Sequence, residues 1–100
     1  AVANWSKTLS VELGPFGITV NNVLPGFTAT DRLEDIVNSA AKRLNKTTEQ
    51  ARDFMTSVVP ARRFAQAEEI AFGIAFLCSP AAGYINGINL PIDGGRTKSL

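Results

Sequence analysis

The residues best suited to hold a ligand lie in one short segment rich in Pro, Gly and Thr. It runs from Pro25 to Thr30 and reads Pro-Gly-Phe-Thr-Ala-Thr. Pro25 and Gly26 turn the chain sharply, and the glycine lets backbone approach a flat ligand closely. The hydroxyls of Thr28 and Thr30, with the free amides at a following helix start, can donate hydrogen bonds to an amide or phosphate oxygen. The same composition is typical of an ordinary strand-to-helix turn with a capping hydroxyl, so both interpretations stay open.

The sequence excludes several other chemistries. It contains no His, which removes Ser-His-Asp triads and imidazole metal sites, and its single Cys78 cannot build a zinc site or an internal disulfide. We expect Cys78 to be a buried small hydrophobe in a reducing compartment. The acids Asp31, Glu34 and Asp35 fit a solvated helix start better than a carboxylate pair. We therefore predict no metal site.

Composition and charge limit the protein further. One hundred residues, 45% of them hydrophobic, are enough for one small domain or part of one. Ten basic residues against nine acidic ones, scattered along the chain, give no surface for nucleic acid. No segment approaches the roughly 20 apolar residues that cross a bilayer, and no leader sequence is recognisable, so we expect no membrane association and a cytoplasmic protein.

Periodicity predicts the elements on either side of the Pro-Gly turn. A helix through the apolar stripe Val2, Trp5, Leu9 and Leu13 ends at Gly14-Pro15. A strand from Ile18 to Leu24 follows, because this segment is short, rich in β-branched residues and bounded by Gly17 and Pro25. Its weak alternation is typical of a strand buried on both faces.

Three helices and a last strand are predicted after the turn. Thr30 or Asp31 can cap a helix that runs from Leu33 to Leu44, and Thr47 with Gln50 forms a capping box for a second helix, which Pro60 ends. A third helix begins at Glu68-Glu69 and continues to Leu77; its apolar residues lie nearly all round, so it must be covered on more than one side. The last strand, Ile88 to Ile92, contains Pro91 and should lie at a sheet edge.

This element order predicts an α/β protein whose two strands are parallel neighbours joined by a right-handed crossover. Two strands are too few for a stable parallel sheet, so we expect the sheet to be incomplete within this chain. In open α/β sheets, ligands bind beyond the carboxyl ends of the strands. We therefore expect a ligand site at the turn Pro25–Thr30.

Five segments together carry a resemblance to a known family. They are Gly17-Ile-Thr-Val-Asn-Asn-Val-Leu-Pro-Gly26, Gly87-Ile-Asn-Leu-Pro-Ile-Asp-Gly-Gly95, the opening helix Ala1–Glu12, and Phe64–Ala71 with the later Phe76–Pro80. They resemble, in order and spacing, the C-terminal part of the short-chain dehydrogenase/reductases, which have a Rossmann-like doubly wound parallel sheet. By general likeness the 3-oxoacyl-acyl-carrier-protein reductases are nearest.

The resemblance implies a nicotinamide site at the turn. Backbone around Pro25, Gly26, Phe27 and Thr28 would face the nicotinamide ring and its carboxamide, and Thr30 would bond the carboxamide or the diphosphate. Residues 31–60 would form a substrate-binding lid within one domain fragment spanning 1–100. Leu33, Phe54 and Met55 would then line a substrate pocket, although an ordinary core role suits them equally well. The cofactor would be NAD or NADP, and the residue that selects between them lies outside these motifs.

The sequence departs from the family at the catalytic residues. The glycine-rich cofactor loop and the family's Ser, Tyr and Lys are absent. Tyr84 is followed four positions later by Ile88, and Lys7 is preceded by Ala3, so neither completes a Tyr-x-x-x-Lys motif. By analogy the missing Lys would lie about two residues before Ala1. We thus expect no catalytic residue in this chain, and Asn86 and Pro91 are further departures.

Two functions of different classes remain open at this stage. The first is part of an oxidoreductase that transfers a hydride between NAD(P)H and a small carbonyl or alcohol substrate, for which a 3-oxoacyl thioester is one candidate, with this chain inactive alone. Its parent would be a homo-oligomer, a tetramer or a dimer, with the first helix, the all-round apolar helix and the last strand in the interfaces. The alternative is a non-enzymatic assembly or binding module.

Overall fold

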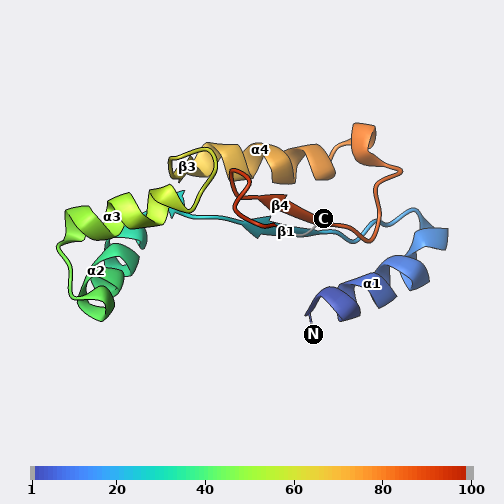
Figure 1. Ribbon diagram of the computed structural model, residues 1–100. Helices are drawn as coiled ribbons and strands as arrows, with labels where there is room; N and C mark the ends of the chain where they lie inside the picture. Colours follow the sequence, from blue (N-terminus) through green and yellow to red (C-terminus); the bar gives the residue numbers. More distant parts are fainter. Residues whose placement is uncertain (1, 99–100) are drawn as a thin grey trace.

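The computed structural model describes residues 2–98 and has extents of 53 × 26 × 24 Å. Figure 1 shows an elongated molecule with three parts: helix α1 (Val2–Leu13) at one end, a small parallel sheet covered by helix α4 (Ala67–Leu77) in the middle, and the pair α2 (Leu33–Leu44) and α3 (Thr48–Ser57) at the other end. No helix among the described residues is long and apolar enough to cross a membrane.

The central sheet pairs strands β1 (Asn22–Pro25) and β4 (Asn89–Ile92) in parallel, with Asn22 opposite Asn89 and Pro25 opposite Ile92. This confirms the prediction of parallel neighbours. Helix α4 lies along one face of the sheet (Figure 1). Gly73 allows that approach, because a Cβ at this position would run into the Ile92 side chain.

The first strand is shorter at its start than predicted. The prediction began it at Ile18, but the structure begins it at Asn22, after the 3-10 turn η1 (Gly14–Phe16). Over the preceding residues side chains replace part of the ladder: Val20 N donates to Asn86 Oδ1 at 2.9 Å, and Asn21 Nδ2 donates to Ile85 O at 3.1 Å. The last strand likewise starts one residue late, at Asn89 rather than Ile88.

A second parallel pair was not predicted. Strand β2 (Thr28–Ala29) pairs with β3 (Ala65–Gln66), which leads directly into α4. A two-residue strand is too short to show a hydrophobic periodicity, so the sequence does not predict it. Their pairing ties both ends of the α2–α3 segment to the edge of the central sheet. A second 3-10 turn, η2 (Pro80–Ala82), follows α4.

The helices largely follow their predicted bounds, and the Thr47–Gln50 capping box is confirmed by both of its bonds, at 3.0 and 3.1 Å. The predicted cap of α2 is wrong. Neither Thr30 nor Asp31 caps it through a side chain; Arg32 precedes the helix, after a turn in which Leu33 N donates to Thr30 O. The main core lies between α2 and α3 and consists of Leu33, Val37, Ala40, Ala41, Ala51 and Met55.

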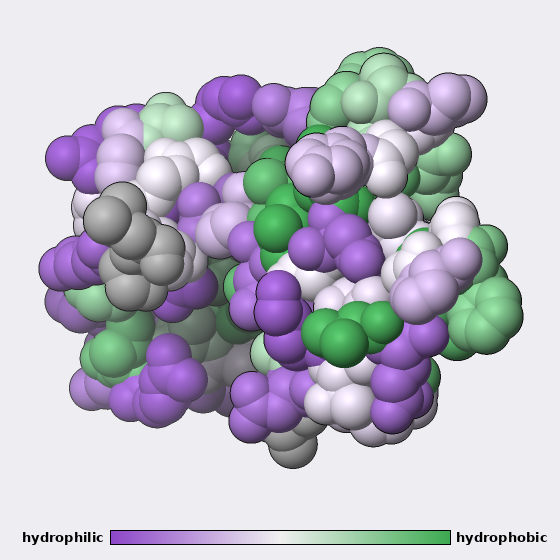
Figure 2. All heavy atoms as spheres, turned by 90° about the vertical axis from the view of Figure 1, so that its right-hand side faces the viewer, coloured by the Kyte–Doolittle hydropathy of each residue, from purple (hydrophilic) through white to green (hydrophobic). Residues whose placement is uncertain are grey.

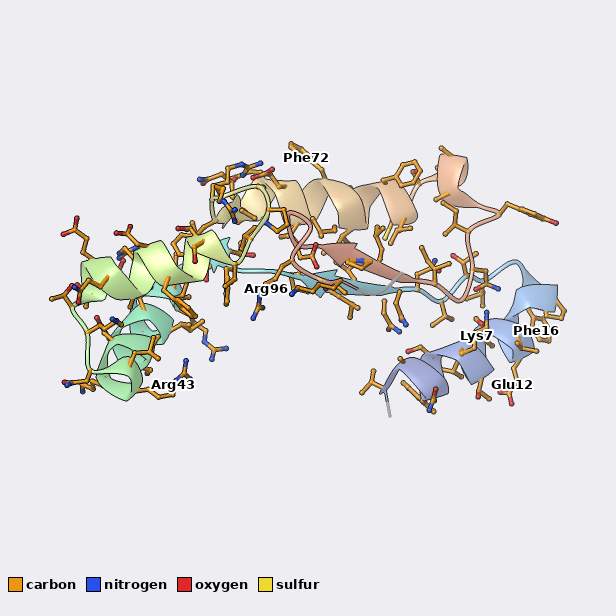
Figure 3. The ribbon with its side chains drawn as sticks, in the orientation of Figure 1. Lys7, Glu12, Phe16, Arg43, Phe72 and Arg96 are labelled. Carbon is orange, nitrogen blue, oxygen red and sulfur yellow. The ribbon has the colours of Figure 1, made fainter. Side chains whose placement is uncertain are left out.

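The outer helices expose much of their apolar surface. On α1 the buried residues are Ser6 and Ser10, whereas Trp5 in the predicted apolar stripe is 65% exposed. On α4, Phe72 is 72% exposed and points away from the sheet (Figure 3). Figure 2 shows hydrophobic residues at the surface of the α1 end of the molecule. Cys78 is also exposed, so its predicted burial is wrong in this chain, because no described residue covers this side of α4's end.

Candidate functional site

The turn after β1 is built around a close backbone approach. Gly26 N donates to Ile92 O at 2.9 Å, which carries the chain one residue beyond the paired strands. A Cβ on Gly26 would lie 2.8 Å from the Cα of Asp93, closer than real Cβ contacts. Only glycine therefore fits where the turn crosses the end of β4. As predicted, the Pro25-Gly26 turn lies at the carboxyl end of a parallel sheet, where open α/β folds bind ligands.

The two threonines of the turn have different surroundings. The Thr28 hydroxyl donates to Gly26 O at 2.9 Å, which closes the turn from inside. Thr30 is exposed, its amide donates to Thr28 O at 2.9 Å, and within residues 2–98 its hydroxyl has no hydrogen-bond partner. Thr30 is thus the hydroxyl of this turn that is able to bind a ligand.

The same turn also contains backbone amides that form no hydrogen bond with the described residues. Across the part of the chain that the structure describes, the amides of Asp31 and Arg32 donate to no protein acceptor. Such free amides just before a helix are suited to an amide or phosphate oxygen. The donors of Thr30, Asp31 and Arg32 are therefore free to bind an amide or anionic oxygen of a ligand.

Phe27 differs from its neighbours in the predicted cofactor set. Its ring packs partly buried against the α2–α3 core and meets the Phe64 ring edge to face, with centroids 6.2 Å apart. The guanidinium of Arg96 lies 4.3 Å from the centre of the Phe27 ring. The Phe27 side chain therefore belongs to the wall between the turn and α2, and its backbone remains at the turn.

Arg96 is placed by a tight turn after β4. The carboxylate of Asp93 accepts hydrogen bonds from Gly95 N at 3.0 Å and Thr97 N at 2.9 Å. Hydrogen bonds from Thr97 and from the neighbouring backbone amides hold the pKa of Asp93 below its ordinary value. Gly94, with a φ of 64°, fits a position that side chains rarely adopt. The ionised carboxylate thus fixes the loop that carries Arg96 beside Phe27.

A cavity of about 720 Å³ opens next to the turn, between α2, α3 and the chain after β4. Of the three residues predicted to line a substrate pocket, Phe54 and Met55 line it, and Leu33 lies in the core instead. Basic residues also line the cavity: Arg32, Arg43, Arg96 and Lys98. Sequence reasoning missed them because it treated the cations as scattered. The helical spacing along one side of α2 could have predicted part of this lining, namely Arg32, Ile36, Ser39 and Arg43. No pattern in the sequence indicates that Arg96 lies beside them.

The described residues contain no group of three or more potential metal ligands. Among residues 2–98 the ion pairs join Arg52 to Glu34 and Arg63 to Glu69. The arrangement around the turn can bind and orient a ligand.

The sequence matches a known family along nearly all of its length. Residues 1–97 match the family model described as Enoyl-(Acyl carrier protein) reductase. The NADPH-dependent reductase BacG of Bacillus subtilis is 41% identical over 100 residues, covering 100% of this chain and 39% of BacG. A 3-oxoacyl-acyl-carrier-protein reductase, FabG of Haemophilus influenzae, is 42% identical over 94 residues, covering 94% of this chain and 34% of that protein. The chain thus spans little more than a third of these relatives.

Solved structures agree with the sequence match. YwfH, an NADPH-dependent reductase involved in bacilysin biosynthesis, superposes with a TM-score of 0.90 at 41% identity, covering 98% of this chain and 37% of YwfH. The actinorhodin polyketide ketoreductase with NADPH gives a TM-score of 0.92 at 33% identity, with coverages of 98% and 38%. The predicted α/β, Rossmann-like fold class is confirmed. The chain belongs to the short-chain dehydrogenase/reductase family.

Proposed function

We propose that this chain is the C-terminal part of an NAD(P)-dependent oxidoreductase that transfers a hydride between a nicotinamide cofactor and a small carbonyl or alcohol substrate. The observation that carries the proposal is the turn Pro25–Thr30, which offers free donors at the carboxyl end of a parallel sheet beside a cavity. The relatives named as NADPH-dependent reductases support the cofactor. The likeness to FabG supports a 3-oxoacyl thioester as one substrate.

The roles of the chain's residues are binding and orientation. Backbone at Pro25, Gly26, Phe27 and Thr28 forms the floor against which a nicotinamide ring would lie, and Thr30 donates to its carboxamide or to the diphosphate. Residues 31–60 form the substrate lid. When bound, the cofactor supplies the hydride. The carbonyl oxygen needs a proton, and no Tyr-x-x-x-Lys pair is present in this sequence to deliver it. We therefore propose that the 100 residues alone are inactive.

The test is the cofactor affinity of the full-length enzyme. Thr30→Val removes a donor from a desolvated acceptor, which costs about 1 to 3 kcal/mol of binding. NAD(P)H titration followed by cofactor fluorescence should show a correspondingly raised Kd. Thr48→Val, which changes an exposed threonine on α3 away from the turn, is the matched control. An affinity equal to that of the unmodified enzyme would contradict the proposed pocket.

We further propose that the enzyme is a homo-oligomer, a dimer or tetramer. Two groups of exposed apolar side chains support it, because such groups mark interaction surfaces: Phe72, Ile74 and Phe76 on α4, and Val2 and Trp5 on α1. Sedimentation of the full-length protein measures its mass in solution, and a monomer at micromolar concentration would contradict the proposal.

A further inference from the structure

The cavity beside the turn has an apolar wall of the size that small ligands use. Its volume of about 720 Å³ falls inside the usual range of roughly 300 to 1,000 Å³ for small-molecule pockets. Both lid helices contribute apolar side chains: Ile36, Ala40 and Leu44 from α2, and Phe54, Met55 and the following Val58 from α3. This wall suits a hydrocarbon or aromatic body rather than a sugar.

The charges around the same cavity are strongly uneven. Four of its lining residues are cations and one, Asp35, is an acid, although the whole chain has ten basic residues against nine acidic ones. The ion pairs found among residues 2–98 involve Arg52 and Arg63, so none of the four cavity cations is neutralised by a carboxylate there. Guanidinium groups that lack a carboxylate partner and lie beside an apolar wall are suited to bind an anionic ligand.

Arg96 and Arg43 line this cavity from the chain after β4 and from α2. Arg96 is oriented by the Asp93 turn and by the Phe27 ring, which restricts a side chain that otherwise has many rotamers. Arg43 projects from the last turn of α2, and Figure 3 shows both arginines on the side of the sheet opposite α4. A rigid, partly stacked Arg is suited to bidentate binding of a carboxylate or phosphate.

We propose that the substrate of this enzyme carries a carboxylate or phosphate on an apolar body, and that Arg43 and Arg96 bind this anion at the cavity between α2 and α3. The inference rests on the proposed function and narrows its substrate class. The shared chemistry is an anionic oxygen group, and comparing carboxylate with phosphonate compounds distinguishes the two sources.

The test is steady-state kinetics of the full-length enzyme with benzoylpropionate, its methyl ester and its phosphonate analogue. We expect kcat/KM for at least one anionic compound to exceed that for the ester about tenfold, which corresponds to about 1.4 kcal/mol. The double variant Arg43→Gln/Arg96→Gln should lose about tenfold with that anion, and less than about twofold with the ester. Lys42→Gln is the matched control, because Lys42 neighbours Arg43 on α2 but lines a different hollow.

Three results separate this proposal from the proposed function. Equal use of ester and anions, or equal losses by the double variant, would overturn the anion site while leaving hydride transfer intact. If none of the compounds is turned over, calorimetric titration of the same compounds in the presence of NADP decides. Tighter binding of an anion that the double variant abolishes supports the site, and its absence overturns it. The unfolding temperature of each variant is compared with that of the control, since both arginines are exposed.

Discussion

At the scale of single residues, Gly26 makes the turn possible by allowing backbone to lie against Asp93. Gly26→Ala should lower the free energy of unfolding of the full-length protein by about 1 to 3 kcal/mol, because the new methyl group overlaps backbone that cannot move aside cheaply. Urea unfolding measures the change. Gly14→Ala is the control, since its Cβ would meet only Asn86 Nδ2, at an ordinary 3.6 Å. Equal changes in the two variants would refute the role of Gly26.

Glu69 provides a prediction for pH. Its carboxylate accepts two bonds from Arg63, at 2.6 and 2.8 Å, and one from Gln66 N at 2.9 Å, which lower its pKa from the ordinary 4.5 to about 2. Because the folded pKa is the lower one, this stabilisation is present above pH 4.5 and is lost as the pH falls toward 2.

An NMR titration of the Glu69 carboxyl carbon checks this value in the full-length protein. The midpoint should lie near 2, and Arg63→Ala should move it upward toward 4.5. Arg52→Ala removes a different ion pair, with Glu34, and should leave the Glu69 midpoint in place. A midpoint near 4.5 in the unmodified protein would contradict the paired geometry.

The residues of the site were predictable to different degrees. The sequence predicts the turn residues Pro25, Gly26, Thr28 and Thr30, because turns depend on the types of a few residues that are adjacent in sequence. Arg96 could not be assigned, since its role depends on the Asp93 turn and on Phe27, which is 69 positions earlier. Asn86 is a similar case: its side chain links Ser10 O to Val20 N, contacts that no local pattern shows.

Among the secondary-structure elements, the predicted bounds of the helices agree with the structure better than those of the strands. Helix α3 has both its capping box and an apolar face within its own segment, so its signal is local. Strand β1 depends on partners from distant parts of the chain, and its predicted first residues are held by Asn side chains instead. The short pair β2–β3 arises only from tertiary structure.

The capping box of α3 can be tested at this scale. Thr47→Ala removes the acceptor of Gln50 N and should destabilise the helix by about 1 kcal/mol. Hydrogen exchange of the α3 amides in the full-length protein should accelerate accordingly. Thr48→Ala, one residue later, removes no cap and serves as the control. Equal exchange rates in the two variants would show that the box contributes nothing to α3.

The whole chain contains the helix pair α2–α3, a turn and one edge of a sheet. The α2–α3 pair has its own buried core, whereas α1 and α4 expose apolar side chains and the sheet has only two described long strands. Such surfaces require further layers or a further copy to cover them. This pattern agrees with a chain that spans about a third of its relatives' length.

A crystal structure of the full-length enzyme with NADP would show whether the turn after β1 lies against the redox ring of a dinucleotide. We expect the nicotinamide ring to contact backbone of residues 25–28 within about 4 Å and Thr30 to donate to the cofactor. A bound ring that lies away from these residues would refute the proposed cofactor site.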